Sequence, residues 1–449
     1  MDDCTMSVKT AEQALLIKMA LQEHKNDLNF ARIAGFASAE HLAHTIPYDL
    51  SANFDPTVPL LAVDDDGALR EYTVTHIETK NPAIVGYILA GKDNNPRVHI
   101  VFRGTADKAS MIRDLEYGGA GQKSFYAEKD LILSQIDAVI RQRANEWTNQ
   151  EELKIKLSIS GHSLGGGDAQ NCFAAISDVM SRLHGHKRFK ERMLDRINGM
   201  KNALVSRTAE PVATSIHAPL TLIDSITVNH VNSAGVTHAT AERCSKSAKY
   251  LAKSGVKIHV RALRVAADGI QQTGQTNILS DIDPAIAKVE VLKVKSNDEG
   301  WLSPKSVVAA AGAAYFSSPL IIAGALGSLT AYGTVKSHTA THFNKVVVQD
   351  QFLHFDNATP EGATAIKHKL SHSSKSIVDN NPISHSLKKI AHAFSSVFVS
   401  KRKVSPQVLN QYEEFKKHIS EHSHHDDESL EALFHEEVLE TTRNVLTFN

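Results

Sequence analysis

A serine flanked by two glycines has the setting best suited to nucleophilic chemistry in this chain. Ser163 stands in the pattern Gly161-x-Ser163-x-Gly165, between a short apolar segment, 155–159, and a stretch with helical character. A sharp strand-to-helix turn at a nucleophile leaves no room for side chains two residues to either side, and glycine meets that demand. The turn also raises the hydroxyl above the edge of a sheet. The pattern therefore predicts a nucleophile elbow with Ser163 at its tip.

The residue after the serine is expected to stabilise negative charge. The backbone N–H of Leu164 would lie at the N-terminus of the following helix, where unsatisfied N–H groups and the helix dipole favour an anion. A serine nucleophile with an imidazole base needs neither a metal ion nor an organic cofactor. The sequence accordingly predicts no metal and no cofactor.

The partners of the serine are expected later in the chain, first an acid and then a histidine. The strand-like segment 256–265 ends just before Asp268, which is the candidate acid; Asp281 and Asp283 in the same loop region are alternatives. The candidate bases are His338 and His342. In such a triad the imidazole takes the serine proton, and the carboxylate fixes its tautomer without itself becoming protonated.

Two segments of the chain resemble a known family. The sequence from Ser160 to Gly166 resembles the elbow of the class 3 lipase family, which includes fungal triacylglycerol lipases. Upstream, Val101-Phe102-Arg103-Gly104-Thr105, followed by Asp114, resembles that family's oxyanion strand and the aspartate after it. The order and separation of the two segments also fit the family.

The resemblance implies a role for several residues outside the elbow. Thr105 would supply the second oxyanion donor through its backbone N–H. Asp268 is similar to the family's acid in a strand-end turn. His338 is favoured as the base because Phe343 stands five residues after it, as an aromatic residue does in the family. The activity implied is hydrolysis of lipid esters, of lipase or phospholipase A type.

Alternation of strand-like and helical segments predicts an α/β-hydrolase architecture, with a largely parallel central sheet covered by helices. We expect an N-terminal helical segment, 1–70, packed on the core and a hydrolase domain over 71–355. We expect that domain to carry a helical insertion at about 181–222 and an apolar hairpin at about 306–331. A His/Ser/Lys-rich and acidic helical extension, 356–449, would follow. The predicted strands are 72–75, 83–90, 98–102, 155–159, 225–231, 256–265 and 289–294, and a helix is predicted over 127–144.

Composition limits the partners. A formal net charge of -1 over 449 residues provides no overall field for nucleic acid, and the expected partner is a lipid or a membrane surface. The N-terminus begins acidic and lacks the basic start and apolar run of a signal peptide, so synthesis in the cytoplasm is expected. The Glu-rich end resembles the translocation signals of bacterial type IV secreted effectors. Export by a specialised system and peripheral membrane association are therefore alternatives.

An uncharged stretch lies between Lys305 and Lys336, in the region between the candidate acid and the candidate base. Three interpretations remain open: a hairpin packed in the core, a lid or lipid-docking element, or a membrane span. For the whole chain the sequence predicts a serine hydrolase acting on lipid esters. The alternatives are a soluble carboxylesterase or acyltransferase, and an inactive hydrolase fold that binds membranes or proteins.

Overall fold

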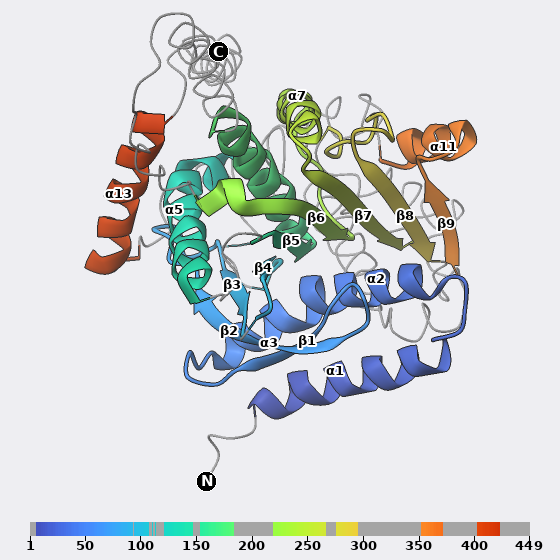
Figure 1. Ribbon diagram of the computed structural model, residues 1–449, viewed down its shortest axis with the longest axis horizontal. Coiled ribbons are helices and arrows are strands. Elements are labelled where there is room, and N and C mark those ends of the chain that lie inside the picture. Colours follow the sequence, from blue (N-terminus) through green and yellow to red (C-terminus); the bar gives the residue numbers. More distant parts are fainter. Residues whose placement is uncertain are drawn as a thin grey trace, which may run out of the picture.

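A central β-sheet organises the protein (Figure 1). The computed structural model describes residues 6–92, 94–106, 110, 113, 121–146, 153–183, 219–265, 275–294, 352–370 and 402–422. Within these ranges nine strands form one mixed sheet, and their order in space is their order in the chain. The α/β class predicted from the sequence is thereby confirmed.

The sheet changes character along its width. The first four strands form an antiparallel meander, the strands from β4 to β8 run parallel, and β9 returns antiparallel to β8. The strands are β1 (Leu60–Val63), β2 (Leu69–His76), β3 (Gly86–Gly91), β4 (Arg97–Phe102), β5 (Ile155–His162), β6 (Ile223–Val231), β7 (Lys257–Val265), β8 (Lys288–Val294) and β9 (Phe352–Asp356). The sequence analysis predicts neither β1 nor β9. β5, which leads to Ser163, lies in the middle of the sheet.

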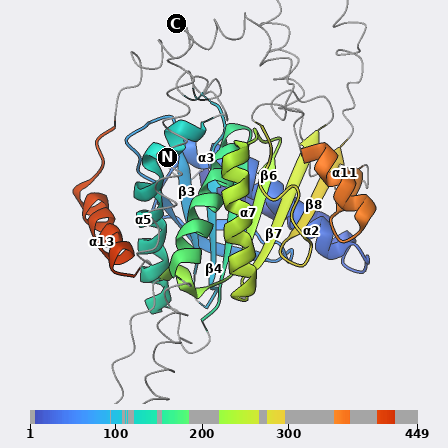
Figure 2. The ribbon, with the colours of Figure 1, turned by 90° about the horizontal axis from the view of Figure 1, so that it is seen from above.

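One face of the sheet is covered by the helices that connect its parallel strands. These are α5 (Gln122–Glu146), the helix over residues 164–183, and α7 (His238–Lys253). Each follows one parallel strand and precedes the next in the same direction across the sheet. Because crossovers of this kind are right-handed, all three helices fall on one face, as Figure 2 shows. α5 is longer at both ends than the predicted helix 127–144.

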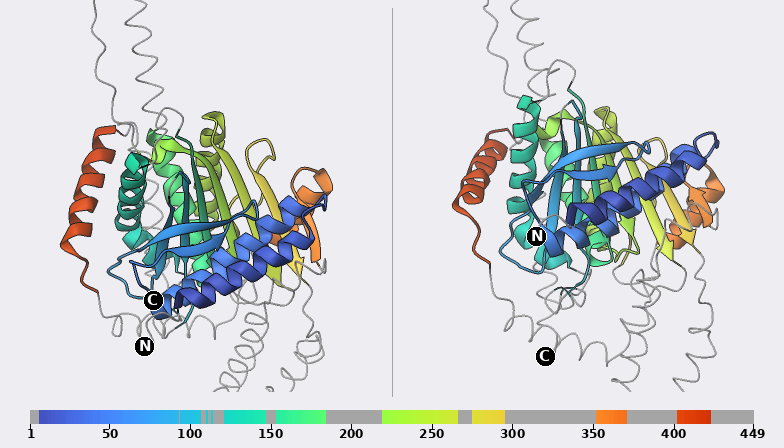
Figure 3. Two further views of the ribbon diagram at one scale, coloured as in Figure 1. Left: turned by 60° about the horizontal axis from the view of Figure 1, so that its bottom comes forward. Right: turned by 90° about the horizontal axis from the view of Figure 1, so that it is seen from below.

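The opposite face is covered by the N-terminal part of the chain. Figure 3 shows α1 (Met6–Glu23) and α2 (Phe30–Glu40) crossing this face. A short π-helix, η1 (His41–Thr45), joins α2 to α3 (Ile46–Asn53) and contacts β4, β5 and β6. Apolar side chains of α1 and α2 pack in one cluster with Val231, Leu263 and Leu292 of the sheet. The N-terminal helices thus complete the core instead of forming a separate unit.

The C-terminal part of the described chain adds two helices. α11 (Pro360–Leu370) packs beside β8 and β9, and α13 (Pro406–His422) packs against α5. The predicted apolar hairpin at 306–331 and residues 184–218 of the predicted insertion lie outside the described residues. None of the described helices combines the length and the apolar character that crossing a bilayer requires.

A buried polar layer lies between the sheet and the N-terminal helices. Asp64 is fully buried and accepts hydrogen bonds from the Tyr72 hydroxyl and from Nε2 of His99, the latter at 2.9 Å. His41 is also fully buried, and its burial, together with the nearby His99, lowers its pKa to about 4. His41 is therefore neutral in the folded protein at pH values where an exposed histidine is protonated.

We expect acid to destabilise the fold through His41. Above the ordinary histidine pKa of about 6.5 both the folded and the unfolded states carry a neutral ring. As the pH falls from 6.5 towards 4, His41 binds a proton in the unfolded state but not in the folded state. The free energy of unfolding therefore falls, by about 3 kcal/mol between these two pH values. Urea unfolding at pH 7 and pH 5 should show a smaller fall in the free energy of unfolding for His41→Gln than for the parent protein. An equal fall in both would contradict this role.

Candidate active site

Ser163 occupies a strained turn at the end of the central strand. It follows His162, the last residue of β5, and has a φ of 57°, while a helix begins at the next residue. A non-glycine residue in this left-handed region costs about 1–2 kcal/mol. Backbone hydrogen bonds hold it there: the Ser163 N–H donates to the Val231 carbonyl at 3.0 Å, and its carbonyl accepts from the Gly166 N–H at 3.0 Å. Such strain is characteristic of functional sites.

The two glycines of the elbow are required by close backbone approach. A Cβ at Gly161 would lie 2.0 Å from the Gly165 carbonyl oxygen, and a Cβ at Gly165 would lie 2.3 Å from the Phe102 carbonyl oxygen. Backbone atoms cannot move aside as a side-chain tip can, so no larger residue fits at either position. The spacing that predicts the elbow therefore has a steric cause in the folded protein.

Both predicted oxyanion donors lie beside the serine in the fold. Leu164 is the first residue of the helix, and the first N–H groups of a helix have no acceptor within it. Gly104, just past the end of β4, is so close to the elbow that a Cβ on it would lie 3.1 Å from the Ser163 Cβ and 2.6 Å from the His162 carbonyl oxygen. Thr105 follows directly. Ser163, Leu164 and Thr105 thus lie together beyond the C-terminal ends of the neighbouring strands β4 and β5.

The structure describes the strand before the predicted acid, but not the predicted acid or base themselves. Asp268, His338 and His342 lie outside the described residues, as does Asp114. Strand β7, which precedes Asp268, ends at the same edge of the sheet as Ser163, since Leu263 is in register with Val231 and, through it, with the end of β5. Asp268 itself lies outside the described residues, so its role as the acid stays a prediction.

The alternative acids lie away from the serine. Asp281 is exposed and pairs with Lys367 at 3.1 Å, and Asp283 is exposed and accepts a hydrogen bond from the Ala285 N–H at 2.9 Å. Both precede the N-terminal end of β8, whereas Ser163 follows the C-terminal end of β5. Since these strands are parallel, the two aspartates and Ser163 lie at opposite ends of the strands.

A buried ion pair beside the elbow is not predicted by the sequence analysis. The Arg113 guanidinium forms two parallel hydrogen bonds with the Asp168 carboxylate, at 2.9 and 2.6 Å, and also donates to the carbonyl oxygens of Ala83 and Gly121. Burial raises the pKa of the Asp168 carboxyl, and the Arg113 charge opposes that rise. The pair joins the region after β4, which carries Thr105, to the helix that begins at Leu164. The one sequence feature that points to this ion pair is Asp168, which comes five residues after the serine and is the only charged residue between positions 164 and 177.

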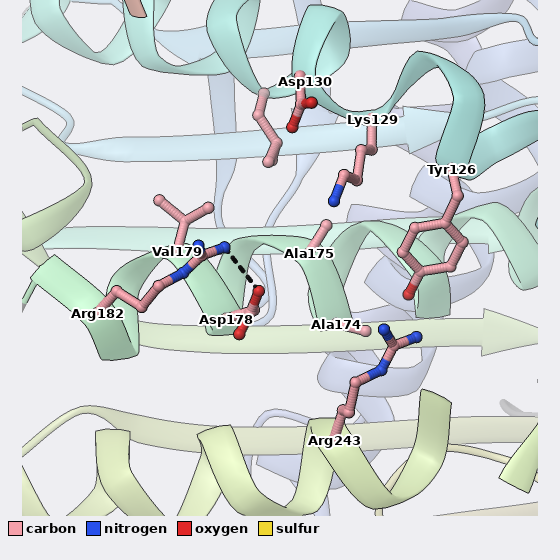
Figure 4. A pocket seen from close by; sticks show the side chains of 10 residues that line it. Tyr126, Lys129, Asp130, Ala174, Ala175, Asp178, Val179, Arg182 and Arg243 are labelled. Carbon is pink, nitrogen blue, oxygen red and sulfur yellow. Dashed lines mark hydrogen bonds and ion pairs between the residues drawn. The ribbon is translucent and has the colours of Figure 1, made fainter. Parts of the chain in front are cut away.

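A surface pocket lies among the helices that cover the sheet, away from the elbow turn. Figure 4 shows it between α5, the helix 164–183 and α7, with Arg182 paired to Asp178. None of the sequence-predicted site residues lines it. Within the described ranges, no three His, Cys, Asp or Glu side chains are grouped as metal ligands would be.

The side chain environment of Ser163 is closed. Ser163 is 3 % exposed, and the hydrogen bonds that the described residues make with it involve its backbone. Little of the Ser163 side chain is therefore open to solvent. Comparison of the chain with protein-family models, with curated proteins and with solved structures finds no match.

Proposed function

We propose that this chain is a serine hydrolase of the α/β-hydrolase type that cleaves carboxylic ester bonds of lipids through an acyl-enzyme. The observation that carries the proposal is the strained backbone of Ser163, which stands at the C-terminal end of the central parallel strand and directly before a helix. The two glycines that the turn cannot do without support the same assignment. A structural turn gains nothing from serine at a left-handed position, where glycine would be free of strain.

The proposed reaction has two stages. His338, oriented by Asp268, takes the hydroxyl proton while Ser163 Oγ bonds to the ester carbonyl carbon, and the N–H groups of Leu164 and Thr105 stabilise the oxyanion. The carbon–oxygen bond to the alcohol then breaks, and the alcohol leaves with the proton from the imidazole. Water, deprotonated by the same imidazole, then attacks the acyl carbon, the bond from that carbon to Ser163 Oγ breaks, and the imidazole returns the proton to Oγ as the fatty acid leaves.

Lipids are the proposed substrates for two reasons. The elbow and the oxyanion segment resemble those of class 3 lipases, and Ser163 is buried, with 3 % of its surface exposed. Moving the groups that bury Ser163 exposes apolar surface. This is most favourable at a lipid–water interface, where lipid contacts that surface in place of water.

Hydrolysis of nitrophenyl esters with and without micelles tests this proposal. We expect a long-chain ester to be cleaved at least roughly tenfold faster once micelles form, because an interface favours the open site. A preference for short-chain esters, indifferent to micelles, would identify a soluble carboxylesterase, and transfer of the acyl group to an added alcohol an acyltransferase. Absence of all turnover in the folded protein would instead indicate a binding module and overturn the proposal.

A further inference from the structure

A cluster of three rings covers the end of the nucleophile strand. His162, the residue before the nucleophile, has its ring 4.6 Å from that of His44 and 6.1 Å from that of Tyr48. The rings of His44 and Tyr48 are 5.4 Å apart. His44 and Tyr48 come from η1 and α3, more than a hundred residues before the elbow in the chain. The N-terminal helices therefore deliver side chains to the candidate site as well as covering the sheet.

The Tyr48 hydroxyl lies next to the serine and the oxyanion segment. A Cβ placed on Gly104 would be 2.6 Å from the Tyr48 hydroxyl oxygen and 3.1 Å from the Ser163 Cβ. The hydroxyl and the nucleophile thus approach one point, at the residue directly before Thr105. A Cβ at Gly104 would also lie 2.6 Å from the His162 carbonyl oxygen, so glycine is required where the Tyr48 hydroxyl and the elbow meet.

The local helical structure explains how Tyr48 reaches this position. Glu40, His44 and Tyr48 are spaced four residues apart, and Glu40 Oε1 lies 3.4 Å from Nδ1 of His44. In an α-helix of about 3.6 residues per turn this spacing drifts around the axis, and the wider turn of η1 opposes that drift. Asp49, beside Tyr48, accepts a hydrogen bond from the Thr10 hydroxyl of α1. Glu40 thus holds His44 on one side of Tyr48, and the contact between Asp49 and Thr10 ties α3 to α1 on the other.

We propose that Tyr48 is a further catalytic residue, whose hydroxyl donates a hydrogen bond to the substrate oxygen held beside Ser163. This proposal rests on the proposed hydrolase function. A neutral tyrosine hydroxyl is a good donor at neutral pH, and it complements two backbone N–H groups with a side-chain donor supplied by the N-terminal helices. Charge develops on the carbonyl oxygen in the transition state, so the bond strengthens there and acts on kcat rather than on KM.

The variant Tyr48→Phe tests the proposal because it keeps the ring and its packing against His44 and His162. We expect kcat for nitrophenyl butyrate to fall by roughly 100-fold with KM nearly unchanged. The rate of phosphonylation of Ser163 by a fluorophosphonate should fall in parallel, since this reaction also develops charge on an oxygen. The matched control is Tyr412→Phe on α13, which removes the same atom from a side chain packed with Lys416. That variant should retain both rates.

The outcomes separate this proposal from the function on which it rests. Parent protein that reacts with the probe, and Tyr48→Phe that reacts and turns over equally fast, would overturn the role of Tyr48 and leave the hydrolase intact. A rise in KM with kcat unchanged would also overturn the proposal, because the hydroxyl would then contribute to substrate binding and not to the transition state. Folded parent protein that never reacts would overturn both.

Discussion

Replacing Ser163 by glycine is expected to abolish ester hydrolysis and at the same time to make the fold more stable. The serine backbone has a φ of 57°, a conformation that glycine adopts without a Cβ penalty. Relief of that strain should raise the free energy of unfolding by about 1 kcal/mol. If Ser163 is the proposed nucleophile, its loss should lower kcat by several orders of magnitude, roughly 10⁵-fold or more, as nucleophile loss does in serine hydrolases. Denaturant unfolding and an ester assay on the same preparation measure both effects.

Ser163→Ala provides the matched control for this pair of effects. Alanine removes the hydroxyl but keeps the Cβ, and therefore keeps the backbone strain. We expect it to lose activity as completely as Ser163→Gly while showing none of the gain in stability. If glycine and alanine leave hydrolysis at the parent rate, Ser163 is not the nucleophile. If only the stability gain is missing, the turn is not strained as described.

The second large effect is expected at the buried ion pair. Arg113→Met would leave the Asp168 carboxylate, which is fully buried, without its charged partner. An unpaired charge in that position costs about 3–5 kcal/mol of stability. Because Asp168 lies on the helix that begins at Leu164, the variant would also break the link between residue 113 and that helix, and the bonds to Ala83 and Gly121 would be lost with it. Urea unfolding should show the loss directly.

A double replacement separates the charge from the shape of this pair. Arg113→Met combined with Asp168→Leu removes both charges and fills the space with apolar side chains, which is often nearly neutral for stability. We expect the double variant to regain most of the stability lost in Arg113→Met alone. A double variant less stable than the single one would show that the carboxylate does not need its partner.

The elbow could be predicted from the sequence because its determinants are local. Residues 155–165 contain the apolar strand, the glycines and the serine within one short stretch, and this pattern is enough to predict a sharp turn at Ser163. The parallel strands were recognisable for the same reason, as apolar segments buried on both faces. β1 has four residues beside an Asp-rich turn, and its place in the sheet depends on pairing with β2. Such pairing carries little local signal.

The other residues around the elbow are brought there by contacts between segments that are distant in the sequence, and no local sequence pattern predicts such contacts. Tyr48 meets Gly104 only because η1 lies across β4 and β5, and Arg113 meets Asp168 only once the chain after β4 lies on the elbow helix. The N-terminal segment reads as helical, yet its π-turn reflects packing rather than residue preference. Sequence patterns therefore predict Ser163, Leu164 and Thr105 as site residues, but not the neighbouring Tyr48 or Arg113.

Covalent labelling distinguishes an activated nucleophile at Ser163 from a serine that only shapes a turn. Folded parent protein is treated with a fluorophosphonate, digested, and its adduct located by mass spectrometry. We predict one stoichiometric adduct on Ser163 that forms faster when lipid micelles are present and is absent from Ser163→Ala. Folded protein that stays unlabelled both with and without micelles, or that carries its adduct on another residue, would contradict the account.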